Sequence, residues 1–263
     1  MTEILQAPGV PKHEMHEFHA KTAPYALIIG VYNEGEKFTR QLAALQPYRN
    51  LVDIIIADGA SNDGATAADA VQRQARTLLI HKEDKRGLSM QYRGALYYAL
   101  EQGYAGVIMM DGNGKDGVEA LPQFIDALND GADFVQGSRF MRGGEHRNTP
   151  LDRVIGIRYV FNPIMFLASG FHYSDAMNGF KACSCAFLSH PGLQLFRDVF
   201  VGYNLQYYLN YRAPKLGIRP REIPVSRCYH DENTPHSKII GIRARLGILK
   251  ELAGVVMGCC NPR

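Results

Sequence analysis

Short apolar stretches alternate with longer amphipathic stretches through the first half of the chain. Five of the short stretches have the length and composition of buried strands. They are Tyr25–Gly30, Asp53–Ala57, Thr77–His81, Val107–Met110 and Asp133–Gly137. Helical patterns lie between them at Glu36–Leu45, Gly64–Gln74, Ser89–Gln102 and Glu119–Leu128. This alternation predicts right-handed crossovers and an α/β fold with a mostly parallel sheet flanked by helices.

The pattern changes after Phe140. The helical stretch Leu151–Ala168 contains Pro163, which predicts a bend or a break in the helix. Further elements predicted downstream are a Tyr-rich helix near Tyr203–Lys215, a strand at Ile218–Val225 and a helix at Lys238–Met257. We therefore expect residues 141–263 to form an α/β extension that completes the domain begun by residues 23–140.

Residues 1–22 precede the first predicted strand and are expected to form an N-terminal arm. His13, His16 and His19 recur there at a spacing of three, and histidine is a common metal ligand. No carboxylate or cysteine lies at a matching offset. A solvated helix or a loose arm is therefore favoured over a metal site.

Polar residues follow the predicted strands where each one ends. They are Tyr32-Asn33-Glu34, Asp58-Gly59, Asp111-Gly112-Asn113 and Ser138-Arg139. The carboxyl ends of parallel strands share one edge, where open α/β sheets bind their ligands. An acidic residue and an amide two positions apart, as at Asp111 and Asn113, suit a hard divalent cation. A plain turn is the alternative, because Asp, Gly and Asn are common turn residues.

The composition is that of a globular protein, with 46% hydrophobic and 21% charged residues among 263. The formal net charge of +3 is compatible with an anionic ligand but is no sign of nucleic-acid binding. No apolar stretch is long enough to span a bilayer, and the N-terminus has no secretory signal pattern. An odd number of cysteines, five, without paired spacings favours a reducing compartment and hence a cytoplasmic location.

The motifs after the first, second and fourth strands occur together with four others in a fixed order. The others are Gly137–Phe140, Asp175–Lys181, Tyr211–Gly217 and His236–Ile239. With this set the chain resembles the family 2 glycosyltransferases, and most of all their dolichyl-phosphate mannosyltransferase-like branch. The resemblance implies the Rossmann-like GT-A fold, a nucleotide-diphosphate sugar donor, inversion at the anomeric carbon and a Mg²⁺ or Mn²⁺ ion. It also implies that residues 141–263 face the acceptor.

The same resemblance implies roles for individual residues. Catalysis would involve Asp111, Arg139, Asp175 and Arg153, and the metal would be held by Asp111 and Asn113. The nucleotide sugar would contact Val31, Tyr32, Glu34, Asp58, Arg86, Asp111, Gly112, Asn113, Asn178, His236 and Lys238. Within these sets Asp58 would contact the base and Arg139 would face the diphosphate. Arg153, His236 and Lys238 would also surround the acceptor. On residue type alone, Asp58 is equally suited to stabilising a turn.

The chain departs from the family pattern at four positions. Asn113 replaces a second acid, which should weaken metal binding, and Lys115 replaces a common Gln and adds a positive charge. Asn204 and Tyr208 stand where relatives often carry Glu. An alcohol acceptor needs a general base, for which Asp175 and Asp116 remain.

A phosphate acceptor needs no general base, because it is already ionised, but it needs cations. Candidates are Arg147, Arg153, Arg158, His236 and Lys238. A polyprenyl phosphate and a glycan therefore both remain open as acceptors. The predicted C-terminal helix carries Arg243, Arg245 and Lys250 beside an apolar face. It either lies on an anionic membrane surface or docks on the core.

Two other functions compete with sugar transfer. A catalytically weak or silent sugar-nucleotide-binding protein is suggested by Asn113, Asn204 and Tyr208. A sugar-phosphate nucleotidyltransferase is disfavoured, because the loop Gly30–Gly35 lacks the arginine that such enzymes place after their first strand. The oligomeric state is not predicted.

Overall fold

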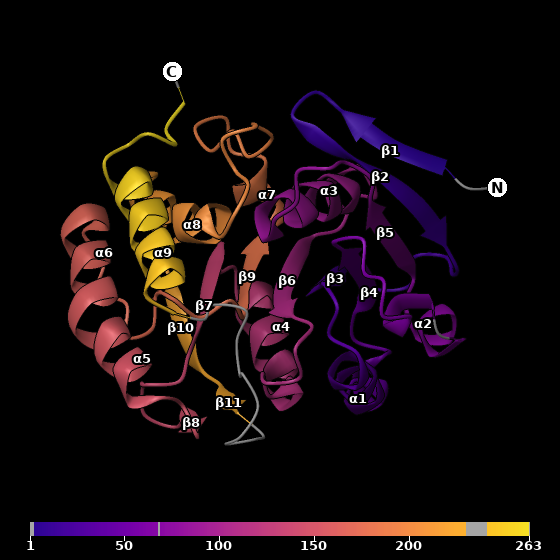
Figure 1. Ribbon diagram of the computed structural model, residues 1–263, viewed down its shortest axis with the longest axis horizontal. Coiled ribbons are helices and arrows are strands. Elements are labelled where there is room, and N and C mark those ends of the chain that lie inside the picture. Colours follow the sequence, from indigo (N-terminus) through magenta and orange to yellow (C-terminus); the bar gives the residue numbers. More distant parts are fainter. Residues whose placement is uncertain (1–2, 68, 230–240, 263) are drawn as a thin grey trace.

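The computed structural model describes residues 3–67, 69–229 and 241–262. In this part of the chain the main sheet has nine strands in the order β1-β2-β5-β4-β3-β6-β9-β7-β10 (Figure 1). They are β1 (Glu3–Ala7), β2 (Val10–Glu17), β3 (Tyr25–Val31), β4 (Asp53–Asp58), β5 (Thr77–His81), β6 (Gly106–Asp111), β7 (Phe134–Ser138), β9 (Lys181–Ser184) and β10 (Arg221–Pro224). A second, two-stranded sheet joins β8 (Glu145–Arg147) to β11 (Ser226–Cys228).

Helices connect most of these strands. They are α1 (Glu36–Ala44), α2 (Asp69–Gln74), α3 (Leu88–Glu101), α4 (Leu121–Asn129), α5 (Leu151–Gly156), α6 (Asn162–Ser169), α7 (Cys185–Leu188), α8 (Asn204–Lys215) and α9 (Gly241–Val256). Short 3₁₀ turns lie at Gln46–Tyr48, Ala65–Ala67 and Val118–Ala120. No helix within the described ranges combines the length and the apolar character that crossing a membrane requires.

The centre of the sheet is parallel, as predicted. Strands β5, β4, β3 and β6 run in one direction, and β9 is antiparallel to both of its neighbours, β6 and β7. All five predicted strands are present, with ends that shift by no more than one residue. The register pairs Val31 with Asp58 and Gly30 with Asp111, so the loops after β3, β4 and β6 begin side by side. The α/β prediction is confirmed.

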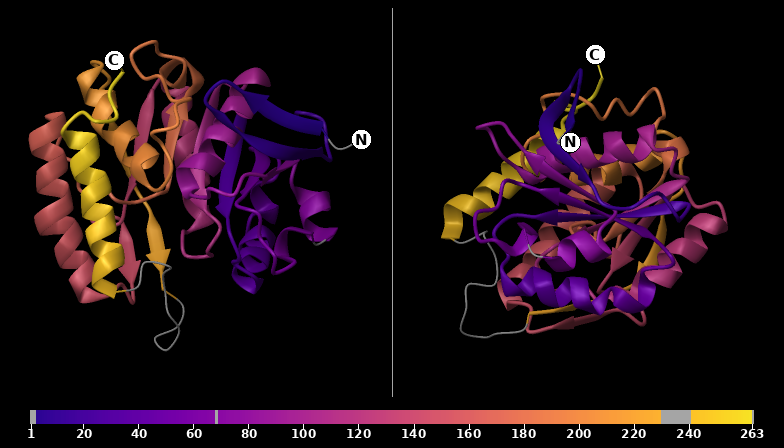
Figure 2. Two further views of the ribbon diagram at one scale, coloured as in Figure 1. Left: turned by 45° about the horizontal axis from the view of Figure 1, so that its top comes forward. Right: turned by 90° about the vertical axis from the view of Figure 1, so that its right-hand side faces the viewer.

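Helices cover both faces of the sheet, which gives three layers (Figure 2). Alternation along β3 shows how the two apolar cores arise. Ala26 and Ile28 pack into the core beneath α3, α8 and α9. Leu27 and Ile29 point the other way, into the core shared with α1 and α4. Strands that are buried on both faces consist almost entirely of apolar residues. The central strands could therefore be predicted from the sequence.

The N-terminal segment is a correction to the sequence prediction. It is neither a helix nor a loose arm, because β1 and β2 form an antiparallel hairpin and β2 pairs with β5 (Figure 1). The hairpin satisfies backbone groups that β5 would otherwise expose at the sheet edge. His13 is buried within it, and the described residues contain no cluster of three or more His, Cys, Asp or Glu side chains suited to a metal.

The helical stretch containing Pro163 is interrupted, as predicted. Helix α5 is followed by a π-helical turn at Ile157–Phe161, and α6 starts with Pro163 in its first turn. Proline lacks a backbone N–H, so it is tolerated where an α-helix starts but not in its interior. The break places Arg153 and Ile157 at the rim of the cavity described below.

Candidate active site

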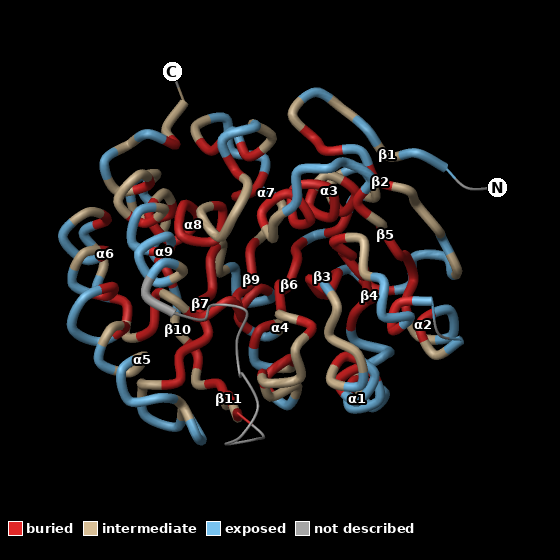
Figure 3. Tube along the Cα trace, viewed as in Figure 1, coloured by how far each residue is buried: buried red, intermediate tan, exposed pale blue. Residues whose placement is uncertain are grey.

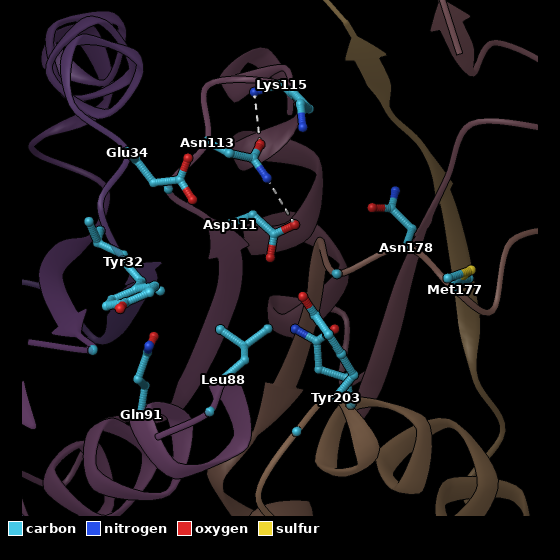
Figure 4. A pocket seen from close by; sticks show the side chains of 18 of the residues that line it. Tyr32, Glu34, Leu88, Gln91, Asp111, Asn113, Lys115, Met177, Asn178 and Tyr203 are labelled. Atoms are coloured by element: carbon cyan, nitrogen blue, oxygen red, sulfur yellow. Dashed lines mark hydrogen bonds between the residues drawn. The ribbon is translucent and has the colours of Figure 1, made fainter. Parts of the chain in front are cut away.

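A cavity of about 550 Å³ lies at the carboxyl edge of β3 and β6. Its walls come from the loops after β3, β4, β6 and β7 and from α3, α5 and α8. Figure 4 shows side chains from these elements pointing into the same space. Ten of the predicted site residues line it: Val31, Tyr32, Glu34, Arg86, Asp111, Gly112, Asn113, Arg139, Arg153 and Asn178. Asp58 and Asp175 are outside the lining, and His236 and Lys238 lie outside the described residues.

Glycines allow the strand-end loops to approach one another. The Gly112 N–H donates a hydrogen bond to the Gly30 carbonyl (2.8 Å), and a Cβ atom at Gly112 would lie 2.9 Å from that oxygen. A Cβ at Gly179 would lie 3.1 Å from Asp111 Oδ1. Gly179 therefore leaves space beside the carboxylate at the centre of the site.

Gln41 of α1 holds the Asp111–Gly114 loop in place. This buried amide donates to the Asp111 carbonyl (2.9 Å) and accepts from the Gly114 N–H (3.0 Å). The Asn113 side chain donates its amide N–H to Asp111 Oδ2 (3.4 Å), and its oxygen accepts from the Lys115 N–H (3.3 Å; Figure 4). Asn113 thus directs nitrogen, not oxygen, toward Asp111. An amide can turn to present its oxygen, so a metal ion shared by the two residues stays a prediction.

Arg227 is a site residue that the sequence analysis missed. Its Nη2 donates to Asp111 Oδ2 (3.1 Å), and its Nη1 donates to Asp116 Oδ1. Burial alone would lower the pKa of the guanidinium, but Asp116 and Asp111 outweigh it and raise the pKa well above its usual value. Arg227 is 116 residues away from Asp111 along the chain, so no local motif links them.

Arg139 lines the cavity, whereas its partner Asp175 lies behind it. The Arg139 Nε donates to Asp175 Oδ2 (2.6 Å), and Nη2 donates to Oδ1 (2.8 Å). Burial alone would lower the pKa of Arg139, but Asp175 outweighs it and raises the pKa. Asp175 is 0% exposed and both its oxygens are engaged. Asp175 therefore fixes the position of the Arg139 side chain, and its catalytic role stays a prediction.

Asp58 is engaged in the turn after β4. Its carboxylate accepts hydrogen bonds from the Ser61 N–H, the Ser61 hydroxyl and the Thr66 hydroxyl. Only 1% of the residue is exposed, and the cavity wall at this point is Gly59. Asp58 thus stabilises the turn after β4, in line with the alternative interpretation, and its contact to a base stays a prediction.

Positive charge dominates the described cavity wall. Two of its side chains are acidic, Glu34 and Asp111, and six are basic: Lys37, Arg86, Lys115, Arg139, Arg153 and Arg227. Arg153 Nη1 donates to the Tyr229 hydroxyl (2.7 Å), and the Lys115 ammonium lies 4.9 Å from the centre of the same ring. Burial lowers the pKa of Lys115. A wall of this composition suits a ligand with several negative charges.

A divalent cation fits this site in part. Asp111 is half-buried, and Gly179 leaves room at its Oδ1, where a hard cation could take one oxygen from the protein. Its Oδ2 is engaged by Arg227, and the Asn113 oxygen is turned away. The donor set therefore fits an ion that draws most of its ligands from phosphate oxygens and water.

Proteins of known function resemble this chain along most of its length. A polyprenol monophosphomannose synthase from Mycolicibacterium smegmatis is 29% identical over 253 residues, which cover 94% of this chain and 93% of that protein. An undecaprenyl-phosphate mannosyltransferase from Micrococcus luteus is 29% identical over 201 residues, or 76% of this chain and 81% of that protein.

The fold matches that of a solved enzyme, glucosyl-3-phosphoglycerate synthase from Mycobacterium tuberculosis, crystallised with Mn²⁺, UDP and glucosyl-3-phosphoglycerate. The TM-score is 0.64 at 14% identity, and the match covers 91% of this chain and 81% of the other. The predicted GT-A fold is thereby confirmed. The model of the family Glycosyl transferase family 2 matches residues 26–193, more than half of the chain. The chain therefore belongs to glycosyl transferase family 2 and is a glycosyltransferase.

Proposed function

We propose that this enzyme transfers a mannosyl group from a nucleotide-diphosphate donor to a polyprenyl phosphate, with inversion at the anomeric carbon. The observation that carries the proposal is the cavity wall itself, in which six basic side chains surround the Asp111 carboxylate and the space where the sugar would be transferred. The names of the two mannosyltransferase relatives support the choice of sugar and acceptor.

The placement of the carboxylates favours a phosphate acceptor over a hydroxyl of a glycan. Asp116 and Asp175 were the predicted candidates for a general base, and both are buried in ion pairs with arginine. Asn204 and Tyr208 bond to backbone atoms of the segment before α8. A phosphate oxygen attacks without losing a proton, so such a site needs cations and no base.

Inversion requires the acceptor oxygen to attack the anomeric carbon opposite the leaving diphosphate. The bond from that carbon to the diphosphate oxygen breaks, and negative charge collects on the diphosphate. A Mg²⁺ or Mn²⁺ ion held by Asp111 would supply positive charge there. Arg139, held by Asp175, adds a fixed positive charge. Tyr32 and Glu34 would contact the nucleoside, and Arg153 would bind the acceptor phosphate.

The acceptor is a lipid, and one face of the enzyme is suited to a membrane surface. Exposed apolar side chains gather on α5, the following π-helical turn and α6, among them Tyr159 (73% exposed) and Leu167 (82% exposed). Arg153 lies on the same helix pair at the rim of the cavity. Peripheral membrane contact through this face would present the lipid phosphate to the site.

The test is a transfer assay with purified protein in detergent. Mannose linked to GDP, UDP or CDP is supplied with either a polyprenyl phosphate or the corresponding polyprenol, and mannosyl-lipid is measured. We expect product with the phosphate and none with the alcohol. Transfer to the alcohol at a similar rate would contradict the acceptor assignment. Donor binding without any turnover would contradict the enzymatic proposal.

A further inference from the structure

Arg227 is placed at the centre of the site by backbone pairing between two distant segments. The Gly117 N–H donates to the Ser226 carbonyl (3.0 Å), and the Cys228 N–H donates to the Lys115 carbonyl (2.9 Å). Asp116 and Arg227 face each other in this short bridge. Strand β11 is therefore tied directly to the loop that follows Asp111, and the Arg227 guanidinium enters the cavity wall between Asp111 and Asp116.

The charges around Asp111 are nearly balanced before any ligand binds. Asp111 and Asp116 bring two negative charges, Arg227 and the neighbouring Lys115 bring two positive charges, and Asn113 brings none. Arg227 also occupies Asp111 Oδ2 directly. Without a nucleotide, a divalent cation would meet one carboxylate, that of Asp111, whose charge is already largely compensated. We therefore expect the cation alone to bind weakly.

A diphosphate changes this balance. It brings several negative charges, offers oxygen ligands to the cation, and is a partner that the planar guanidinium of arginine binds well. We propose that Arg227 couples the metal to the donor: it holds Asp111 in the donor-free enzyme and moves its hydrogen bond to a diphosphate oxygen when donor and cation enter together. This rests on the proposed use of a nucleotide-diphosphate donor. It assigns Arg227 as a donor-binding residue and makes metal binding depend on the nucleotide.

Coupling of this kind is reciprocal. If the nucleoside diphosphate tightens Mn²⁺ binding by some factor, Mn²⁺ tightens nucleotide binding by the same factor. Factors of about 10 to 100 are typical for coupled sites. Removing Arg227 should shift the two affinities in opposite directions. Asp111 becomes available to Mn²⁺ alone, while the diphosphate loses a partner.

The experiment compares two variants that differ only at position 227. Arg227→Met alone would strand the buried Asp116, whose Oδ2 already has no hydrogen-bond partner among the described residues. We therefore use Asp116→Asn as the background and Asp116→Asn with Arg227→Met as the test. Mn²⁺ is titrated into each protein by calorimetry without nucleotide, and GDP, UDP and CDP are then each titrated with Mn²⁺ present. Thermal unfolding confirms that both proteins fold.

We expect the double variant to bind Mn²⁺ alone several-fold more tightly than the background and to bind the preferred nucleoside diphosphate about 10-fold less tightly or worse. Arg86→Met is the matched control, since it removes another cation from the wall of the same cavity. It should weaken nucleotide binding without strengthening that of Mn²⁺. Loss of both affinities in the double variant, or no change in either, would overturn the proposal.

Neither sugar nor acceptor is present in these titrations. If the two variants show the expected opposite shifts but the wild-type protein fails the transfer assay, the proposed reaction is refuted and the role of Arg227 stands. A protein that transfers mannose but shows no difference between the two variants would refute the role of Arg227 alone.

Discussion

Among the single side chains of the site, Asp111 is the one whose surroundings constrain it most. Its backbone carbonyl is held by Gln41, its Oδ2 by Arg227, and its Oδ1 faces the space left by Gly179. Asp111→Asn keeps the shape but removes the charge. We expect kcat/KM for transfer to fall about 10²- to 10³-fold, which is typical when one electrostatic contact to the leaving group is removed.

The same variant should lose its response to Mn²⁺ in donor binding while unfolding at a temperature close to that of the wild type. The fold should survive because Arg227 still has Asp116 as a partner. Calorimetric titration of the donor with and without Mn²⁺ gives the measurement. An unchanged Mn²⁺ dependence would contradict the placement of the ion at Asp111.

Arg153 is expected to contribute to the binding of the acceptor and not to that of the donor. It belongs to α5 and lines the cavity, whereas Tyr32 and Glu34 come from the loop after β3. We expect Arg153→Ala to raise KM for the polyprenyl phosphate about 10-fold or more and to leave the donor Kd nearly unchanged, since a charge-assisted hydrogen bond contributes about 1.5–3 kcal/mol. Arg158→Ala is the control, because that guanidinium stacks on Phe140 and is not part of the cavity wall. Equal losses for donor and acceptor would contradict the assignment.

At the level of strands and helices, the sequence was informative where burial is complete on both faces. Strands β3 and β6 are apolar except for Asp111 at the end of β6, and their composition and length identified them. Strand β9 was not predicted. Its sequence, Lys-Ala-Cys-Ser, has a buried lysine and becomes a strand because it fits between β6 and β7. Its pairing with β6 and β7, and not a local sequence pattern, makes this segment a strand.

The loops that form the site were likewise predictable only in part. Tyr32, Glu34 and Asp111 were predicted because a residue at the end of a buried parallel strand must lie at the ligand-binding edge. Arg227 was missed because its position depends on pairing between residues 115–117 and 226–228. The turn contacts of Asp58 were not predicted, since strand-end position alone does not distinguish a side chain that faces the cavity from one that folds back on its own turn.

Lys181 of strand β9 is expected to make the stability of the protein depend on pH. Lys181 donates to Asn210 Oδ1 (2.6 Å) and to the Gln206 carbonyl of α8, and burial lowers its pKa from the ordinary value of 10.5 to about 8. Between these values the unfolded chain binds the proton more tightly than the folded protein does. The contribution of Lys181 to the free energy of unfolding therefore rises with pH through this window.

From pH 8 to pH 9.5 we expect Lys181 to add about 1–2 kcal/mol to the free energy of unfolding. The measurement is urea denaturation of the wild type and of Lys181→Met at both pH values. Taking the difference between the two proteins cancels the contributions of the tyrosines and cysteines that titrate at higher pH. If the two proteins change in parallel, Lys181 is already neutral or already fully charged across the window, and the prediction is wrong.

On the scale of the whole molecule, helix α5 joins the cavity to the exposed apolar surface, because it carries Arg153 of the cavity wall and the exposed Leu151 and Ile155. Helices α5 and α6 follow one another in line, and α9 lies beside them, at one end of the sheet away from the β1–β2 hairpin (Figures 1 and 2). Helix α9 is docked on the core through Ile248, Leu252 and Val255, so its inner face is not available to a membrane. The outer surfaces of the three helices are largely exposed (Figure 3).

This outer surface combines apolar and basic side chains in the way that interfacial helices do. Its exposed apolar residues are Leu151, Ile155, Tyr159, Val160, Phe166, Leu167, Leu246, Leu249 and Met257. Arg243 and Lys250 are exposed on α9, and an ion pair from Arg245 to Asp152 links α9 to α5. Such a face would hold the enzyme at the membrane surface. The lipid phosphate would then reach the Arg153 side of the cavity by diffusing in two dimensions within the membrane.

We therefore expect the wild type to bind vesicles of phosphatidylcholine containing phosphatidylglycerol, and Leu167→Glu to bind them about 10-fold less tightly. Withdrawing one leucine from the interface costs about 1.5–3 kcal/mol, and the new negative charge adds to that loss. Ile4→Glu is the matched control, because Ile4 is 51% exposed on β1 at the far end of the molecule. Vesicle co-sedimentation gives the affinities, and transfer to a short-chain, water-soluble polyprenyl phosphate should be the same in all three proteins. If Leu167→Glu and Ile4→Glu weaken vesicle binding equally, net charge and not this face governs the contact, and the helices α5, α6 and α9 have no special role in reaching the lipid.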